Sequence, residues 1–510
     1  MDHGSDEEGE DYPLLIEQRC YQEDDQRDGK SRTLQSYWVR VRQPSPSWII
    51  IIYTCYQIIF GILAVPELNA TFALICHQRH TGQTQKDAPN TRDLAGELQQ
   101  CFASEDAQAD LSRFTMYGQM IAGLLGAISS PILGSLSDRV GRKPILACVA
   151  IGPLIYEAIM VSVLRYPDSI NMHWLLVGYA SQGLSGSLIT VTSTSQAYIT
   201  DLVRLRARAR LFSYLQAALS LAASLGPVIS GLLLTLPNSL ENIYKSAVYA
   251  HLSLILIFLF VLPESRSSHL DNAERDESTP EQNTSETYLQ IFLQSLRSLK
   301  EYSTFLQRNI VILAGIDMFI FGILIGLFPL QLAYPAYLFK WQPTTQSFFT
   351  SMVNSWSILV LVLIFPMIMA RVRRWKKITI TPSLSLFNVG ELGAIQASLA
   401  LQIIGYVGIA LARSPGVFIF SSFIVASAAP LTPLLTSCLT AHTPDHQSGQ
   451  LLGFLSFLHA IARVGVPALL NATYSMTIGI YPAPLFLLLS IIIAGLLIAS
   501  MSIRTSTNTL

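Results

Sequence analysis

Long apolar stretches dominate the chain and are separated by shorter polar segments. A helix needs about 20 predominantly apolar residues to cross the hydrocarbon core of a bilayer. Read with a window of that length, the pattern predicts twelve membrane-spanning segments, at roughly 48–76, 112–133, 144–164, 174–200, 211–235, 246–262, 309–333, 347–370, 393–412, 416–440, 448–471 and 481–502. The expected fold class is therefore an all-α membrane protein with twelve transmembrane helices.

Polar segments divide these helices into two groups of six. Residues 1–47 contain an acidic block and few apolar residues, and we expect them to form a disordered cytoplasmic tail. The stretch 263–308 is rich in Glu, Asp, Ser and Asn and is expected to be a solvated linker. The chain is thus predicted to contain a six-helix bundle at 48–262, a second six-helix bundle at 309–502 and a short tail at 503–510.

The distribution of Lys and Arg predicts which helix ends face the cytoplasm, because these residues accumulate on cytoplasmic loops. They are concentrated in the segments 139–143, 204–210 and 371–377. The shorter loops on the opposite side hold single basic residues, such as Lys245 and Arg413. An even number of helices places both termini on one side, and we expect that side to be the cytoplasm.

Composition narrows the class of function. The chain is 51% hydrophobic and 13% charged, whereas an average soluble protein has about 25% charged residues. A formal net charge of −1 gives no reason to expect nucleic acid as a partner. The sequence has neither a Cys and His cluster with metal-site spacing nor a phosphate-binding glycine loop. We therefore expect no enzyme, no metal and no cofactor, but a monomer in the lipid bilayer whose partners are a small-molecule substrate and protons.

The polar loop between the second and third predicted helices carries a motif. Its residues are Gly134, Ser135, Leu136, Ser137, Asp138, Arg139, Val140, Gly141, Arg142 and Lys143. This loop resembles the G-x-L-x-D-R-x-G-R-K signature of the major facilitator superfamily, with every position of the signature filled. The glycines are expected to permit a tight turn, and Asp138 to cap a helix N-terminus and also to hold a basic side chain. The resemblance implies two pseudo-symmetric six-helix bundles, a midplane site exposed alternately to each side, and a gating role for the loop.

Other segments are similar to members of the same superfamily. They are the end of the fourth helix at 197–201, the end of the sixth helix at 263–265, and the residues Gly226, Pro227 and Gly231 in the fifth helix. The last three resemble part of an antiporter signature, but Ser213 and Ala222 replace its upstream glycines, which weakens the inference of antiport. The segment around Cys76 and the long first outer loop also resemble the fungal relatives of the proton-coupled folate transporter group.

Charged side chains inside membrane helices are rare and costly, so each one is a candidate functional group. Asp317 lies in the seventh helix, and His459 and Arg463 lie four residues apart on one face of the eleventh. Asp317 and His459 are expected roughly 12 and 17 Å from the cytoplasmic ends of their helices, with Arg463 about one turn further out. We hypothesise that a proton exchanges at Asp317 or His459 while Arg463 supplies a fixed positive charge; a permanent structural ion pair is the alternative. Glu67, near the outer end of the first helix, is a further coupling candidate unless it simply contacts water.

Hydroxyl groups are concentrated in the fourth helix, which lines the cavity in the architecture that the resemblance implies. Thr190, Thr194 and Gln196 are the candidates for contact with a substrate, because they can hydrogen-bond a ligand while uncharged. Alternatively, these hydroxyls bond to carbonyls of their own helix and ease helix packing.

Several features concern the outer face and the destination of the protein. Cys76 and Cys101 flank the long outer loop and would pair on an oxidising face; two free thiols are the alternative. Asn69 and Asn471 begin glycosylation triplets near outer helix ends, although close to lipid. We expect a multi-pass protein of the cell membrane, and an acidic dileucine-like segment at 10–15 keeps the vacuolar membrane as the alternative.

The preferred interpretation is a secondary active transporter that works by alternating access, through proton-linked export of a metabolite or drug-like compound. The predicted cavity helices have few fixed charges and many apolar and hydroxyl side chains, which suits amphipathic organic molecules. Proton-coupled uptake of a nutrient or cofactor is the alternative. A third interpretation is a sensor with a transporter fold that binds without transporting, and the short C-terminal tail argues against it. The sequence indicates neither the substrate nor the direction of transport.

Overall fold

The computed structural model describes residues 44–83, 104–203, 205–265, 308–376, 389–441, 448–479 and 483–503, and this part of the chain is helical without any strand. Ten of its helical segments are long and apolar enough to cross a membrane. The fourth segment, which is broken into two shorter helices, and the 30-residue helix α19 (Ser448–Thr477) bring the number to twelve. The predicted fold class is confirmed, whereas the predicted tails and linker lie almost entirely outside the described residues.

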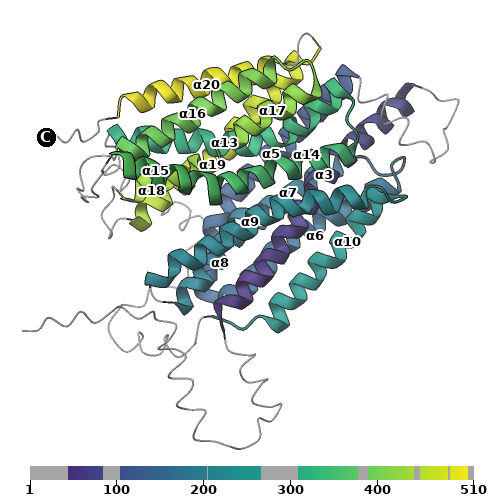
Figure 1. The fold of residues 1–510 in the computed structure, drawn as a ribbon. Helices are drawn as coiled ribbons and strands as arrows, with labels where there is room; N and C mark the ends of the chain where they lie inside the picture. The colour runs from purple at the N-terminus through teal and green to yellow at the C-terminus, as the bar shows by residue number, and fades with distance from the viewer. Residues whose placement is uncertain are drawn as a thin grey trace, which may run out of the picture. The chain divides into compact units, whose positions relative to one another are not determined.

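The first six membrane segments form one bundle, drawn from purple to teal in Figure 1. Its helices are α3 (Pro46–Gln83), α5 (Glu105–Val140), α6 (Arg142–Arg165), α7 (Trp174–Leu184) with α8 (Ser187–Leu202), α9 (Leu205–Leu233), and α10 (Ser239–Leu256) with the π-helical η1 (Ile257–Val261). Helix α3 packs along α9, and α6 packs against α7 and α10. A Cβ atom on Gly226 would lie 2.3 Å from the backbone of Gly61, so this glycine of the antiporter-like motif permits α3 and α9 to approach closely.

The second bundle, drawn from green to yellow, contains the other six segments. Its helices are α13 (Arg308–Phe339), α14 (Pro343–Leu359) continued by η3 (Val360–Ile364) and α15 (Phe365–Lys376), α16 (Val389–Ala410), α17 (Pro415–Ala426) with α18 (Leu431–Ala441), α19, and α20 (Pro484–Met501). Helix α13 packs against α19, and α16 packs against α17 and α20. Phe418 lies at the centre of an aromatic cluster with Tyr334, Phe339, Trp341 and Phe349, which closes one end of this bundle.

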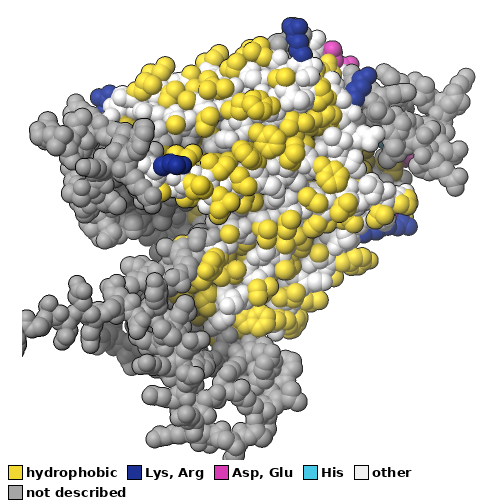
Figure 2. All heavy atoms as spheres, in the orientation of Figure 1, with side chains coloured by type: hydrophobic (Ala, Val, Ile, Leu, Met, Phe, Trp, Pro, Cys, Tyr) yellow, Lys and Arg dark blue, Asp and Glu magenta, His cyan; other side chains and the backbone are white. Residues whose placement is uncertain are grey.

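The surface of the helices is apolar. Figure 2 shows hydrophobic side chains spread over one face, with few Lys and Arg side chains, which lie towards its edges. Large apolar side chains such as Phe260 and Met476 are more than three-quarters exposed. A soluble protein rarely exposes so much contiguous apolar area, and this surface therefore fits a lipid environment.

The two bundles contact each other mainly along two helix pairs, α5 with α19 and α9 with α14. Hydrogen bonds cross this interface from the middle of the membrane segments to the end that bears residue 104, which the Lys and Arg distribution predicts to face outward. We call this the outer end. The buried or partly buried cross-bundle bonds join Asn69 to Gln346, Ser112 and Gln119 to Asn471, Ser224 to Ser355, Ser230 to Ser347, and Asn354 to the carbonyl of Ala223. These bonds, together with the packing of α5 on α19 and of α9 on α14, join the two bundles from the middle of the membrane segments to the outer end.

Two of the residues in these cross-bundle bonds are the predicted glycosylation sites, and the structure argues against that prediction. Asn69 and Asn471 have no exposed surface. The Asn69 amide donates to the Gln346 amide oxygen at 3.0 Å and to the carbonyl of Val65. The Asn471 amide donates to Gln119 and to the carbonyl of Pro467. A glycosylating enzyme cannot reach either nitrogen in this arrangement, because both side chains are buried. The sequence triplet carries no information about burial.

Candidate functional site

The motif loop is a one-residue turn between α5 and α6. Gly141 ends α5 and begins α6 with a φ angle of 107°, which side chains other than glycine rarely adopt. A Cβ atom there would also lie 2.6 Å from the Glu264 carboxylate. Gly134, by contrast, lies inside α5 with no atom near its Cβ position. The tight turn was predicted from two glycines, and the structure assigns it to Gly141 alone.

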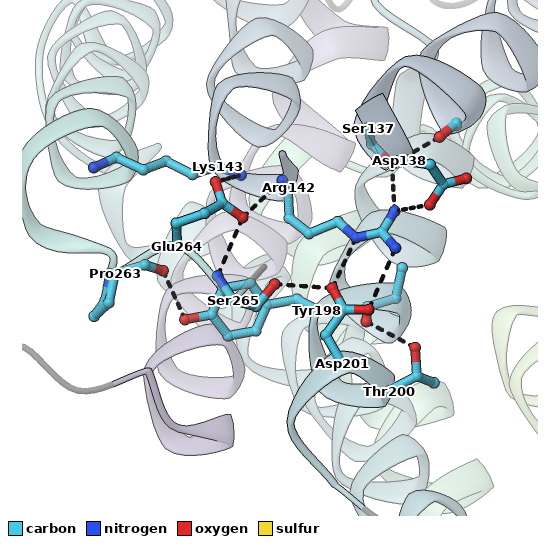
Figure 3. Close-up of polar contacts among 12 residues, drawn as sticks. Ser137, Asp138, Arg142, Lys143, Tyr198, Thr200, Asp201, Pro263, Glu264 and Ser265 are labelled. Carbon is cyan, nitrogen blue, oxygen red and sulfur yellow. Dashed lines mark hydrogen bonds and ion pairs between the residues drawn. The ribbon is translucent and has the colours of Figure 1, made fainter. Parts of the chain in front are cut away.

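Arg142 is the centre of a buried polar network at this turn (Figure 3). Its guanidinium contacts the Asp138 carboxylate at 2.5 Å, the Asp201 carboxylate at 3.0 Å and the Ser137 hydroxyl at 2.7 Å. The arginine is almost fully buried, whereas the Asp138 side chain is 61% exposed. Asp201 also accepts a hydrogen bond from Ser265 at 3.0 Å. The network therefore joins α5, α6, α8 and the segment that follows η1.

The helix cap at this turn comes from a residue that we had not expected there. Glu264 accepts hydrogen bonds from the backbone N–H groups of Arg142 (2.9 Å) and Lys143 (3.2 Å), the first residues of α6. A carboxylate is favoured at a helix N-terminus because it satisfies free N–H groups and complements the helix dipole. Asp138 was predicted both to cap a helix and to hold a basic side chain; it holds the Arg142 side chain, whereas Glu264 provides the cap. Of the other motif residues, Leu136 packs against the apolar core of the bundle and Arg139 is exposed.

A second site lies in the membrane core of the second bundle. His459 of α19 and Asp317 of α13 are in contact, with 2.7 Å between Nε2 and Oδ2. The Asp317 side chain is 2% exposed and that of His459 is 25% exposed. The Phe321 ring stacks on the imidazole at 4.0 Å between ring centroids. The structure thus brings together Asp317 and His459, which were predicted to be closer in depth than Asp317 and Arg463.

Arg463 lies one turn beyond His459 on α19 and reaches towards the other bundle. One terminal nitrogen of its guanidinium lies 4.0 Å from the position of a Cβ atom on Gly126 of α5. The carbonyl of Arg463 likewise lies 3.5 Å from a Cβ position on Gly123. The positive charge of Arg463 therefore lies at the interface between the two bundles.

Glu67 is not part of this site. It lies on α3 in the first bundle, where the hydroxyls of Tyr156 and Tyr179 both donate to its Oε1 at 3.1 and 2.8 Å. The alternative that Glu67 simply contacts water did not include these two donors, which are 89 and 112 residues away in the sequence, and its role as a coupling residue stays a prediction.

The hydroxyls of the fourth membrane segment divide between two faces. Thr190 and Thr194 are buried inside the bundle, so their prediction as cavity-lining residues is wrong in this structure. The Thr190 hydroxyl instead bonds to Ser130 and to the carbonyl of Gly186. Gln196 is half-buried and Ser193 is exposed, so the accessible polar face of α8 runs through Ser193. The bond from Thr190 to the Gly186 carbonyl agrees with the alternative that these hydroxyls bond to carbonyls of their own segment.

Two membrane segments are broken at corresponding places in the two bundles. The fourth segment breaks at Gly186, whose φ of 82° separates α7 from α8. The tenth breaks between α17 and α18, where Ser427 accepts a hydrogen bond from the Trp356 indole. Interrupted helices at equivalent positions of two repeats mark the binding region in many secondary transporters. The break at Gly186 was not expected from the sequence.

The remaining predicted residues have packing or covalent roles in the structure. Pro227 lies inside α9 next to Gly226, and Gly231 faces Ser347 of α14 across the bundle interface. Cys76 is disulfide-bonded. Its predicted partner, Cys101, lies outside the described residues, so that pairing stays a prediction.

Comparison with known proteins agrees with this architecture. A family model of the Major Facilitator Superfamily matches residues 101–467. The chain is 44% identical over 473 residues to the MFS-type transporter avaJ of Aspergillus versicolor, a match that covers 92% of this chain and 90% of that protein. It is 27% identical over 365 residues to the class C tetracycline resistance protein of Escherichia coli, covering 70% and 80%.

The expected likeness to the folate transporter group is present but short. The proton-coupled folate transporter of Bos taurus is 25% identical over 154 residues, which cover 30% of this chain and 32% of that protein. Among solved structures, the human organic anion transporter MFSD10 (TETRAN) shares the fold with a TM-score of 0.55 and 18% identity, over 90% of this chain and all of that chain. The chain therefore belongs to the Major Facilitator Superfamily of membrane transporters.

Proposed function

We propose that this transporter exports a small organic molecule by alternating access and draws on the proton gradient. The observation that carries the proposal is the contact between Asp317 and His459 inside the membrane. Charged groups are costly at this depth and are usually kept for function. Histidine is also the side-chain type whose charge most readily changes near neutral pH.

One proton changes the electrostatics of this site. With a carboxylate, a neutral imidazole and a guanidinium, the net charge of Asp317, His459 and Arg463 is zero. Proton uptake at Asp317 or His459 raises it to plus one. Because a net charge in a low-dielectric region is expensive, protonation changes which orientation of the bundles is favoured. Arg463 extends to α5, so the change is felt at the moving interface.

The accessible side chains favour an amphipathic organic substrate. Ser193 on α8, and Thr432 and Ser437 on α18, are exposed hydroxyls on the two broken segments. Ile51 on α3 and Leu324 on α13 are exposed apolar residues. Hydroxyls can hydrogen-bond a ligand without fixed charge, and apolar groups can bury its hydrocarbon. A relative named for tetracycline resistance is consistent with such a substrate and with export.

Proton-coupled uptake of a nutrient or cofactor is the second candidate. The observation that favours it is the short match to a proton-coupled folate transporter. Comparing cells with and without the gene, across a metabolite panel that includes tetracycline, separates the two directions. Export predicts higher accumulation without the gene, and uptake predicts lower accumulation. A protein that binds without transporting predicts no difference.

The coupling residue is tested with Asp317→Asn. We expect this variant to lose the pH dependence of transport while it still exchanges substrate across the membrane, because the neutral amide keeps the shape of the carboxyl group but cannot titrate. Initial rates and counterflow in vesicles over a range of pH measure both properties. If Asp317 and His459 form only a structural pair, the variant should be less abundant, and the remaining protein should keep its normal pH dependence.

The matched control is Glu157→Gln. Glu157 and His251 form another buried carboxylate–histidine pair, at 2.8 Å between α6 and α10, away from the bundle interface. We expect Glu157→Gln to affect protein abundance and to leave the pH dependence of transport unchanged. If Glu157→Gln lost the pH dependence and Asp317→Asn kept it, the coupling site would lie in the first bundle and the proposal would be wrong.

A further inference from the structure

The first bundle contains a carboxylate that is held only by phenol hydroxyls in the described part of the chain. Glu67 of α3 accepts hydrogen bonds at one oxygen, Oε1, from Tyr156 of α6 and Tyr179 of α7. Within the described residues, no ion pair joins it to a Lys, Arg or His. This differs from Asp317 and Glu157, each of which contacts a histidine.

Packing fixes the two tyrosines in place. A Cβ atom on Gly118 of α5 would lie 2.6 Å from the Tyr179 ring, and one on Gly178 of α7 would lie 2.7 Å from the Tyr156 ring. Both glycines therefore leave room for an aromatic ring between helices. The two rings lie 5.1 Å apart between centroids. The two hydroxyls converge on Glu67 because packing among α5, α6 and α7 holds both rings in place.

A third phenol belongs to the same cluster. Tyr244 of α10 has no exposed surface, and its hydroxyl has no hydrogen-bond partner in the described residues. It belongs to the same buried core as Tyr156 and Tyr179. The other titratable groups facing this region are Glu157, next to Tyr156 on α6, and its partner His251 on α10. An unpaired buried hydroxyl is unfavourable, which points to a bonding arrangement that this state does not use.

We propose that Glu67, with Tyr156, Tyr179 and Tyr244, is a second proton-exchange site, in the first bundle. A phenol can donate to a carboxylate and can accept from a carboxylic acid O–H. The cluster can therefore satisfy both protonation states of Glu67, and the free Tyr244 hydroxyl is available when the bonds rearrange. The proton joins or leaves one carboxyl oxygen, and no other bond is made or broken.

The position of the cluster favours proton exchange with the outer side. Tyr179 and Tyr244 each lie five residues from the start of their helices, α7 and α10, which is roughly 8 Å along the axis. Both helices start at the outer end, and Glu67 is only half-buried. The site in the second bundle lies nearer the membrane middle. The role of Glu67 in coupling rests on the proposed function, whereas proton binding there does not.

Infrared difference spectroscopy of the full-length protein in liposomes tests proton binding directly. Acidification should produce a carboxylic acid C=O band, which Glu67→Gln should remove and Asp317→Asn should leave in place. Tyr179→Phe should shift the same band to higher frequency, because the carboxyl group loses a hydrogen bond. This readout needs no substrate, so it stands even if Asp317→Asn shows that the proposed coupling at the other site is wrong.

Two results would overturn the proposal. One is a set of titrating carboxylic acid bands that is unchanged in Glu67→Gln. The other is a band that disappears in Glu157→Gln and not in Glu67→Gln, which would place the proton on the neighbouring pair. If Glu67→Gln does not fold, Tyr179→Phe decides the question: a shifted band supports the site and an unshifted band contradicts it.

Discussion

The outer and cytoplasmic ends of the molecule are held by different kinds of interaction. At the outer end, the bonds between the bundles join uncharged amides and hydroxyls, such as Asn69 with Gln346 and Ser224 with Ser355. One exposed bond from Tyr337 to Glu105 is the exception. At the cytoplasmic end, the described network is ionic, centres on Arg142, and stays within the first bundle.

The energies of these interactions explain the division. A neutral hydrogen bond contributes about 0.5–1.5 kcal/mol net, because water can replace the lost partner. Removing one partner of a buried ion pair costs roughly 3–5 kcal/mol. Neutral bonds therefore suit an interface that opens and closes in every cycle. The buried charge of Arg142, which Asp201 holds, suits a part of the protein that stays rigid while it moves.

The largest effect is expected from locking the outer end. Ser224 and Ser355 face each other across the bundles with 2.5 Å between their hydroxyl oxygens, a separation close to that needed for a disulfide. Ser224→Cys with Ser355→Cys should lose transport on oxidation and regain it on reduction. Cys55, Cys148 and Cys438 are replaced beforehand to avoid other pairings. Each single cysteine variant is the control, and normal transport by the oxidised double variant would show that the outer end does not need to open.

A smaller effect is expected at the cytoplasmic end from Asp138→Asn. The protein should fold, because Asp138 is largely exposed and Asp201 still holds Arg142. Transport should be roughly tenfold slower, equivalent to about 1.4 kcal/mol in the barrier. Initial rates normalised to surface abundance measure this change. Asp201→Asn is the comparison and should reduce abundance instead, because Asp201 bonds both Arg142 and Ser265. Transport at the normal rate by the Asp138→Asn variant would contradict a gating role for the motif.

The smallest effect is expected from the pair Asn69 and Gln346. Loss of one buried amide bond should shift the equilibrium towards an open outer end by about 1 kcal/mol. A double-mutant cycle with Asn69→Ala and Gln346→Ala, read by accessibility of a cysteine at the outer interface, measures the coupling. Additive single effects would mean that this bond does not hold the outer end closed.

The sequence predicted the membrane segments well because the bilayer imposes a length and an apolar character on each of them. All twelve predicted ranges overlap an observed segment. It also predicted the similar depths of Asp317 and His459, since rise per residue is constant in a helix. Their contact also requires that α13 packs against α19, which is a tertiary contact.

The features that the sequence did not predict depend on contacts between distant residues or on helix faces. Glu264 caps α6 from 122 positions away, and no local pattern marks that pairing. Gly186 breaks the range 174–200, which the apolar pattern predicted as one membrane segment. Asn69 and Asn471 look like surface triplets but bond across the bundle interface. Their burial follows from tertiary packing and not from their neighbours in the chain.

Paired spin-label distances test most directly whether protons drive an alternating exposure of the two ends. One pair is placed at Leu236 and Leu411 on outer loops, and another at Val140 and Met367 near the cytoplasmic ends, all of them exposed. We predict that a change of pH lengthens one distance while it shortens the other, and that Asp317→Asn abolishes this response. Distances that do not respond to pH, or that change in the same direction at both ends, would contradict proton-linked alternating access.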